Sequence, residues 1–395
     1  MDGGVRLTRR DVLRLGAVTG PGLAVGGCPA DRRHAAREST EAPEGPADVT
    51  IRIAPVLVEL VPHLVISTIG YNGSVPAPII RLREGHPVIV ELINETDTPE
   101  LVHWHGQMEG SEDIWPRGML EPPPRDPRPN GFEVGYRFFS INGKALGHGE
   151  PVRVGRGERV MFRILNASAT ENIQLALPGH EFEVVALDGN AVPPLAASAS
   201  CPLDVAERID AIVTMDNPGI WILGTPRDDD RRNGMGIVVE DAGASDEPRW
   251  IPPAPVPWGY AIFGVSRPVP EPDERIPLVF GKINGGPHGF NRWTINGEQF
   301  EDSSPIPLRA GRRYRLAFVN RTADVHPVHL HRHSFELVSV NGRPTAGIVK
   351  DTVVVPPFGT VEADFVADNP GATLFHCHQI IHMEYGFKRL FTYVE

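Results

Sequence analysis

Histidine is the residue whose placement in this chain most clearly points to chemistry. Nine of the 15 histidines fall in three short segments. They are His103 and His105; His326, His329, His331 and His333; and His376, His378 and His382. Imidazole and thiolate are ligands that transition metals prefer, and Cys377 lies inside the last segment, so the clusters indicate a metalloprotein. A lone histidine more often fills a core or surface position, which is our interpretation of His34, His63, His86, His148 and His288.

The spacing of the last segment predicts two metal sites on one strand. Side chains two residues apart on a strand share a face, so His376 and His378 point one way and Cys377 the other. His326 and His382 can reach the Cys377 side. A thiolate with two imidazoles is the trigonal arrangement of a blue copper centre. Two metals joined through one strand favour electron transfer between them.

An internal repeat indicates the elements that must position these residues. Asn-Gly pairs at 72, 142 and 296 each precede a glycine and an alternating strand that ends on asparagine, at 85–94, 157–166 and 311–320. Residues 180–189 also parallel 333–342. The chain has 41 glycines and 40 prolines, about a fifth of it against a usual ~12%. This pattern predicts an all-β protein of several β-sandwich domains.

The repeat also shows that the first unit is short. Asn142 and Asn296 are 154 positions apart, but Asn72 and Asn142 are only 70 apart, which leaves the first unit 84 residues short. Either the first domain is a half sandwich with an open edge, or part of an ancestral domain has been lost.

Composition and charge exclude several classes of function. Lys and Arg number 38 against 50 Asp and Glu, a net charge of −12, so no basic face is available for nucleic acid. Three cysteines cannot form a disulfide framework. Cys201 reads as a small buried side chain. Asp351 and Glu384 are either carboxylates near a substrate or proton path or, as we expect, solvated carboxylates.

Four motifs resemble the multicopper oxidases, specifically the laccase-like group with three cupredoxin domains. They are Tyr71-Asn72-Gly73-Ser74-Val75-Pro76-Ala77-Pro78, His103-Trp104-His105-Gly106, His326-Pro327-Val328-His329-Leu330-His331, and His376-Cys377-His378 followed by His382. The resemblance extends from about Thr50 to the C-terminus. It implies tandem cupredoxin-like Greek-key β-sandwich domains with the first truncated.

The expected domains follow from the repeat and the resemblance together. They are an export signal and linker at 1–48, the truncated N-terminal domain at 49–114, a Pro-rich linker at 115–133, a middle domain without copper at 134–244, a second Pro-rich linker at 245–274, and the C-terminal domain with type 1 copper at 275–395.

The resemblance also implies the copper ligands, for up to four copper ions per chain. It places type 1 copper on His326, Cys377 and His382, type 2 copper on His103 and His329, and the type 3 pair on His105, His331, His376 and His378. Electrons from a donor would pass from Cys377 through His376 or His378 to the cluster, where four of them reduce O₂ to water. Phe387 falls at the axial type 1 position, where many relatives have Met, which implies three-coordinate copper of higher potential. His333 and its counterpart His180 read as structural.

One departure from the family pattern affects the cluster. The family uses eight histidines there, and this chain supplies six at matching positions. The missing pair belongs in the segment that the repeat shows to be absent, since after Gly106 the chain passes through a Pro-rich stretch directly into the second domain. By the resemblance, each type 3 copper loses one of its three ligands.

The N-terminus resembles a targeting signal. Arg9-Arg10 precede an apolar, Gly-rich run from Leu15 to Gly27 and resemble a twin-arginine export signal. Cys28 is either the lipidated residue of a lipobox or an incidental cysteine in a cleavage region. No other stretch reaches the ~18 apolar residues of a membrane span. We expect a protein of the periplasm or outer cell surface, with a lipid anchor if Cys28 is modified.

These observations favour an exported oxidase of small donors. The resemblance implies one-electron oxidation coupled to reduction of O₂, and the seven scattered methionines favour phenols or aromatic amines over cuprous ions. One alternative is a type 1 copper electron carrier with an impaired cluster. Another is a degraded homologue whose first domain cannot fold.

Overall fold

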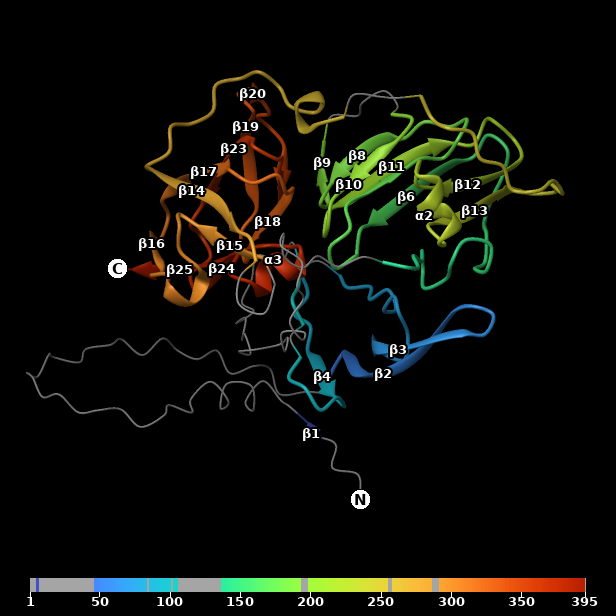
Figure 1. The fold of residues 1–395 in the computed structure, drawn as a ribbon, viewed down its shortest axis with the longest axis horizontal. Coiled ribbons are helices and arrows are strands. Elements are labelled where there is room, and N and C mark those ends of the chain that lie inside the picture. The colour runs from blue at the N-terminus through green and yellow to red at the C-terminus, as the bar shows by residue number, and fades with distance from the viewer. Residues whose placement is uncertain are drawn as a thin grey trace, which may run out of the picture. The chain divides into compact units, whose positions relative to one another are not determined.

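The computed structural model describes residues 5–6, 46–83, 85–100, 102–105, 136–192, 198–254, 258–285 and 291–394. The chain forms two compact units, Met1–Leu101 (unit 1) and Val102–Glu395 (unit 2). The described part is mostly strand, with only short helices (Figure 1), which confirms the all-β fold class. Its helices include none that is long and apolar enough to cross a membrane. Arg9-Arg10, Cys28, Gly106, His34, His288 and the linker at 115–133 lie outside the described residues.

Unit 1 contains one four-stranded sheet in the order β1-β4-β2-β3. Strand β2 runs antiparallel to β3 and parallel to β4. The buried side chains include Ile51, Ile53 and Ile93. The strands are β1 (Val5–Arg6), β2 (Val49–Val61), β3 (Leu64–Tyr71) and β4 (Val90–Asn94).

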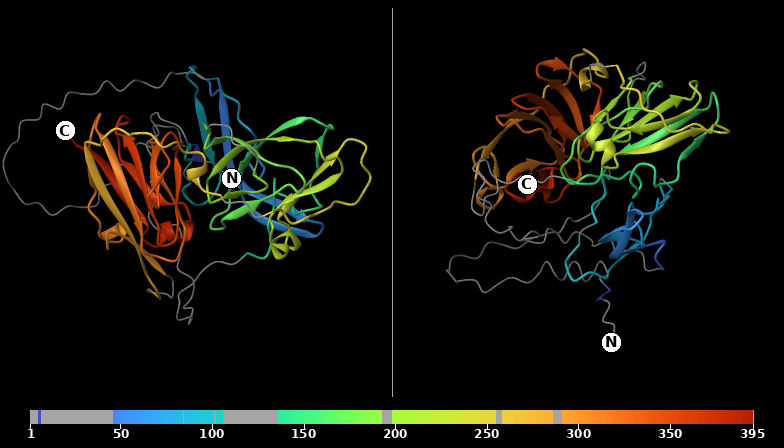
Figure 2. Two further views of the ribbon diagram at one scale, coloured as in Figure 1. Left: turned by 90° about the horizontal axis from the view of Figure 1, so that it is seen from above. Right: turned by 45° about the vertical axis from the view of Figure 1, so that its right-hand side comes forward.

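The first part of unit 2 is a sandwich of short strands, here called the middle sandwich, drawn green to yellow in Figures 1 and 2. Its sheets have the orders β6-β11-β8-β9, β12-β13-β5 and β10-β7. The alternating burial of β11 is typical of a strand with one face in the core. The elements are β5 (Val152–Val154), β6 (Arg159–Leu165), β7 (Ile173–Leu175), β8 (Glu183–Leu187), β9 (Asn190–Ala191), β10 (Cys201–Leu203), β11 (Arg208–Thr214), β12 (Ile220–Gly224), α2 (Asp228–Arg232) and β13 (Gly236–Asp241).

The second part of unit 2, here called the C-terminal sandwich, is drawn orange to red in Figure 1. One sheet follows the order β15-β14-β17-β23-β19-β20 with β21 paired to β19, and the other the order β16-β25-β24-β18-β22. Aromatic rings fill its core; Phe318 stacks on Phe375 with ring centroids 5.6 Å apart.

The elements of the C-terminal sandwich and its approach are η1 (Tyr260–Ile262), β14 (Glu274–Ile283), β15 (Arg292–Ile295), η3 (Phe300–Asp302), β16 (Ile306–Arg309), β17 (Arg313–Asn320), β18 (His326–Leu330), β19 (Phe335–Val340), β20 (Arg343–Pro344), β21 (Val349–Lys350), β22 (Thr352–Val355), β23 (Thr360–Val366), β24 (Thr373–Cys377), α3 (Ile380–Glu384) and β25 (Lys388–Val394).

The repeat found in the sequence corresponds to a repeated hydrogen-bond device. Asn72, Asn142 and Asn296 all have positive φ, at 50°, 54° and 56°, as the first residue of an Asn-Gly turn requires. The asparagines that end the repeated strands also behave alike. Asn94 and Asn320 each accept a hydrogen bond from the backbone N–H two residues on, at 2.9 Å in both cases. The same device therefore shapes the loops that lead toward His103 and toward His326, the starts of two of the histidine motifs.

Candidate metal centre

Strand β24 presents the predicted two faces. It lies beside β18 in a register that pairs His329 with His376 and Val328 with Cys377. All five residues of β24 and all five of β18 are buried. His376 faces a group of histidines, whereas Cys377 faces His326 and His382 on the opposite side. Two donor groups therefore lie on opposite faces of one strand.

The first group is His326, Cys377 and His382, here called the thiolate group. The Cys377 Sγ atom lies 3.7 Å from Nδ1 of His326 and 3.5 Å from Nδ1 of His382, and the two Nδ1 atoms lie 3.2 Å apart. A point in the plane of these three atoms is about 2.0 Å from each of them, which is close to the length of a first-row metal–imidazole bond. The donor set and its triangle fit the trigonal site of a blue copper centre.

The loop before β18 fixes the tautomer of His326. The Thr322 hydroxyl donates to Oδ1 of Asn320 at 2.9 Å, so its lone pairs are left to accept from Nε2 of His326 at 2.8 Å. A proton on Nε2 leaves the Nδ1 lone pair of His326 toward Cys377. The residues present thus prepare a neutral imidazole for metal binding.

Aromatic side chains surround the thiolate group. Phe387 is fully buried, with its ring centroid 4.7 Å from that of His326, and it offers no donor atom to a metal. Gly386 precedes it at φ 110°, where an added Cβ would lie 2.5 Å from the Trp293 carbonyl oxygen. Trp293 itself stacks on His382 at 4.1 Å and donates from Nε1 to Asp324. These contacts exclude water and hold the His382 ring.

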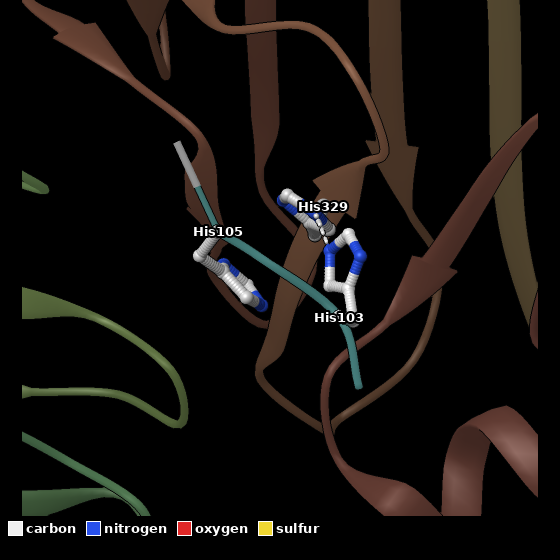
Figure 3. A group of neighbouring side chains, drawn as sticks. All are labelled: His103, His105 and His329. Carbon is white, nitrogen blue, oxygen red and sulfur yellow. Dashed lines mark hydrogen bonds between the residues drawn. The ribbon is translucent and has the colours of Figure 1, made fainter. Parts of the chain in front are cut away.

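The second group consists of six histidines, here called the histidine cluster, and they meet as three pairs. Nε2 atoms lie 3.1 Å apart in the pair His103–His329, 3.0 Å in His331–His376 and 3.0 Å in His105–His378. Figure 3 shows His103 and His105 on one extended segment facing His329 on β18. The first pair consists of the two residues that the resemblance assigned to type 2 copper, and the other two pairs contain the four that it assigned to the type 3 ions. Their assignment as copper ligands stays a prediction.

Hydrogen bonds at the far ring nitrogens point the Nε2 atoms inward. His329 donates from Nδ1 to the Asp351 carbonyl at 2.7 Å, and His376 donates from Nδ1 to the Cys377 carbonyl at 3.0 Å. An imidazole with its proton on Nδ1 keeps the Nε2 lone pair for a metal. These two cluster histidines are therefore oriented by the chain itself, with Nε2 free to face a metal.

Burial keeps the donor groups in forms suited to metal binding. It lowers the pKa of His329, His376 and His378 well below the usual value, and neighbouring imidazoles lower it further. Burial likewise lowers the pKa of His382 to about 3. These rings are neutral at neutral pH, as ligands must be. Burial raises the pKa of Cys377, so a bound metal must displace its proton.

The structure accounts for the other residues singled out from the sequence. His333 donates to the His331 carbonyl at 3.0 Å and accepts from the Tyr393 hydroxyl at 2.8 Å. His180 donates to the Pro178 carbonyl at 3.1 Å. Cys201 is fully buried, and burial raises its pKa to about 12.

The two carboxylates behave differently from each other. Asp351 was expected to be solvated, and this is wrong: it is 1% exposed because Arg208 neutralises it. Glu384 is less completely buried, with its side chain 14% exposed, and lies 3.9 Å from Nζ of Lys388.

Sequence reasoning missed a register that relates the middle sandwich to the histidine motifs. His103 and His105 follow Asn94 by nine and eleven positions, and His329 and His331 follow Asn320 by the same intervals. At the same intervals after Asn166 the middle sandwich has leucines, Leu175 and Leu177, both buried. Apolar side chains occupy there the positions that hold imidazoles elsewhere.

A cleft with charged and apolar lining residues opens beside the histidine cluster. Its volume is about 720 Å³, and its lining includes His105, Arg208, Asp188, Arg163 and Asp210. The described residues of the cleft come from both sandwiches of unit 2. Of the six cluster histidines, His105 lines this cleft.

Comparisons with known proteins identify the family. Three family models, each described as multicopper oxidase, match residues 58–123, 123–242 and 275–395. The first match is about half as long as either of the others. The solved structure of a multi-copper oxidase from Pseudomonas thermotolerans has the same fold, with a TM-score of 0.65 and 24% identity over 88% of this chain and 100% of that one.

Two relatives extend along most of the chain. The multicopper oxidase MmcO of Mycobacterium tuberculosis is 26% identical over 430 aligned positions that cover 84% of each chain. Because 430 exceeds the 395 residues here, MmcO has segments without a counterpart in this chain. Laccase-9 of Arabidopsis thaliana is 22% identical, over 81% of this chain and 84% of its own. With copper-type donor groups on both faces of β24 and family matches along most of its length, this chain belongs to the multicopper oxidase family, the copper-dependent oxidoreductases that reduce O₂.

Proposed function

We propose that this protein is a laccase-like oxidase that removes one electron at a time from small phenols or aromatic amines and uses O₂ as the acceptor. The observation that carries the proposal is the arrangement of two donor groups on opposite faces of β24. Cys377 belongs to one group, while its neighbours His376 and His378 belong to the other. Only a few covalent bonds separate the two groups.

The residues present would hold copper in both groups. The thiolate group suits type 1 copper, the pair His103–His329 suits type 2 copper, and the pairs His331–His376 and His105–His378 suit the type 3 ions. Copper bound there supplies one-electron redox chemistry, accepting electrons from a donor and delivering four of them to O₂.

The chain's own residues prepare both groups. Phe387 and Phe280 pack on the His326 ring at 4.7 and 5.7 Å and keep water from the thiolate group. The Asp351 carbonyl holds the tautomer of His329. Such fixed surroundings reduce the rearrangement that a change of charge at the site would require.

Two observations support small organic donors. Seven methionines are spread along the chain, without the Met-rich segment that a route for cuprous ions would favour. Laccase-9, which is similar over most of its length, is named for laccase activity.

Oxygen uptake with matched donors tests this function. We expect the copper-loaded protein to consume O₂ with a dimethoxyphenol and an aromatic diamine faster than with ferrous or cuprous ions. Cys377→Ser should abolish both the blue colour and the uptake, whereas Cys201→Ser, at the other buried free cysteine, should keep both. A colourless copper-replete protein would refute the type 1 assignment, and faster uptake with metal ions would refute the organic donor.

A second candidate is a type 1 copper electron carrier, which the six-histidine cluster favours. Each of its pairs offers two imidazoles per metal. The described histidines beyond these are exposed, as His63, His86 and His148 are, or have other partners, as His180 and His333 do.

Copper content and reoxidation distinguish the two functions. The oxidase should hold about four copper ions per chain and the carrier one or two. Stopped-flow mixing of the reduced protein with oxygenated buffer measures the return of the blue band. Rapid return with four-electron reduction of O₂ supports the oxidase, and slow return supports the carrier.

We also propose export through the twin-arginine-like segment. Arg9→Lys together with Arg10→Lys should retain the protein in the cytoplasm, and Cys28→Ser should release it from the membrane fraction if Cys28 is lipidated. Unchanged fractionation in the first test would argue against this export route, and in the second against the anchor.

A further inference from the structure

Asp351 contacts two of the six cluster histidines, each through a different group. Its backbone carbonyl accepts the Nδ1 proton of His329 at 2.7 Å. Its carboxylate oxygen Oδ1 lies 3.6 Å from Nδ1 of His105. Nδ1 of His105 is buried, with no hydrogen-bond partner among the described residues, so this carboxylate is the polar group that faces it. Asp351 therefore contacts two rings, on their Nδ1 sides, that would bind different metals.

The Asp351 carboxylate is fixed by an arginine from the other sandwich. Arg208, the first residue of β11, donates from Nη1 to Oδ1 at 2.6 Å and from Nη2 to Oδ2 at 2.5 Å. The planar guanidinium fork matches a carboxylate in this two-bond manner and restricts its rotation. The Thr352 hydroxyl adds a third bond to Oδ1 at 3.0 Å. Burial alone would raise the pKa of Asp351, but Arg208 and His105 together outweigh burial and lower it.

Arg208 is itself held in place by Asp188 of the middle sandwich. The backbone N–H of Arg208 donates to Oδ1 of Asp188 at 3.0 Å, and the backbone N–H of Thr352 donates to Oδ2 of the same carboxylate at 3.1 Å. Nζ of Lys350 lies 3.0 Å from that Oδ2 atom. The residues on each side of Asp351 are therefore tied to the sandwich that carries Arg208.

We propose that Arg208 and Asp351 are positioning residues of the histidine cluster. The middle sandwich, with leucines where histidines occur elsewhere in the repeat, holds His105 and His329 in their ligating orientation through this pair. The inference rests on the proposed copper cluster. With two imidazoles per metal, misorientation of one ring removes half of the protein ligands of that metal.

The inference predicts a loss of cluster copper that leaves the thiolate group unaffected. Outer residues that orient a metal ligand typically account for about 10- to 100-fold in metal affinity. Arg208→Met should lower the affinity of the histidine cluster for copper by about that factor, while the blue absorption of the thiolate group stays unchanged. Asp351→Asn loses the ion pair, but its amide oxygen can still accept one hydrogen bond from Arg208, so it should weaken the cluster less than Arg208→Met. Arg208→Lys keeps the charge without the fork and should fall between wild type and Arg208→Met.

The cleft supplies a matched control. Arg163 lines the same cleft but is exposed, with Nε 3.8 Å from Asp210, so Arg163→Met removes an equal charge without touching Asp351. Full-length variants are loaded with Cu(II), desalted and measured for copper per chain, blue absorption and the electron paramagnetic resonance signal of type 2 copper. Dialysis against a graded chelator gives the affinity.

Chemical rescue separates positioning from a merely structural role. Because the Arg208 side chain borders the open cleft, guanidinium ions at millimolar concentration should restore cluster copper to Arg208→Ala, and urea at the same concentration should not. If Arg208→Met fails to fold, Arg208→Lys and Asp351→Asn carry the test, with thermal unfolding of the copper-free proteins as the check on folding.

The outcomes are distinguishable. Cluster copper and a type 2 signal in the Arg208 and Asp351 variants equal to those of Arg163→Met would overturn the positioning inference alone. Wild-type protein that holds blue type 1 copper without cluster copper would overturn the proposed oxidase, and this inference with it. Loss of cluster copper with an intact blue band, reversed by guanidinium, would support both.

Discussion

Replacement of Lys350 by methionine should destabilise unit 2, because it would remove the cation that lies between two buried carboxylates. Nζ of Lys350 is fully buried, 3.0 Å from Asp188 and 3.1 Å from Oε1 of Glu207. Burial opposes the charge on Lys350, but the two carboxylates outweigh it and raise the pKa of Lys350. Methionine has a similar volume, so the change removes the charge with little repacking.

The magnitude follows from what each carboxylate retains. Removing one partner of a buried ion pair typically costs about 3–5 kcal/mol of unfolding free energy. Asp188 keeps two backbone donors and the Arg208 guanidinium 3.6 Å away, and Glu207 keeps the Tyr260 hydroxyl and the backbone N–H of Asp204. We therefore expect the lower end, about 3 kcal/mol, and a fall in Tm of roughly 6 to 12 °C.

Thermal unfolding of the copper-free protein, followed by near-ultraviolet circular dichroism, measures the effect. Arg159→Met is the control, since it breaks an exposed ion pair with Glu183 worth no more than about 1 kcal/mol. The double variant Lys350→Met with Glu207→Gln should regain part of the loss because one carboxylate is then neutral. A Lys350→Met protein as stable as the control would refute the reasoning that these charges depend on one another.

Three further outcomes are expected. Phe387→Met should lower the reduction potential of type 1 copper by adding a weak thioether ligand; a redox titration with an unchanged or higher potential would count against the axial placement. Trp293→Leu should speed removal of type 1 copper by a chelator, followed at the blue band, because His382 loses its stacked ring, and Trp293→Phe should do so less. Burial, reinforced by Glu207, raises the pKa of Asp204 to about 8 from 3.8. The folded protein then binds its proton more tightly than the unfolded chain, so this contribution to stability is present below pH about 4 and is lost as pH rises through about 8. Asp204→Asn should make the decline in unfolding free energy with rising pH less steep, as measured by denaturant titrations. An unchanged pH dependence of stability would contradict the raised pKa of Asp204.

The sequence could predict the parts of the site that depend on local geometry. Alternation along a strand separates Cys377 from His376 and His378 whatever surrounds them, and the structure has them facing different groups. The Asn-Gly turns were also predictable, because positive φ at Asn and Gly follows from their side chains. Both inferences need only a few consecutive residues.

The parts that could not be predicted depend on partners far apart in the chain. Asp351 was expected to be solvated because most carboxylates are, and nothing near it in sequence suggests otherwise. Its partner Arg208 lies 143 positions away, in a domain expected to have no part in metal binding. Lys350 and Glu207 were missed for the same reason. Long-range ion pairs leave no local pattern.

The register of the repeat indicates a supporting role for the middle sandwich, although this sandwich supplies no histidine to the cluster. Where β18 has His329 and leads to His331, the middle sandwich has Leu175 and Leu177 in its core. A leucine cannot bind a metal, but it fills the core of the middle sandwich. From that sandwich β11 directs Arg208 toward Asp351. The thiolate group takes all three of its donors from the C-terminal sandwich and needs no such support. The histidine cluster takes two of its six rings from the segment next to the boundary of unit 2. Damage to the middle sandwich should therefore disable the cluster while the thiolate group survives.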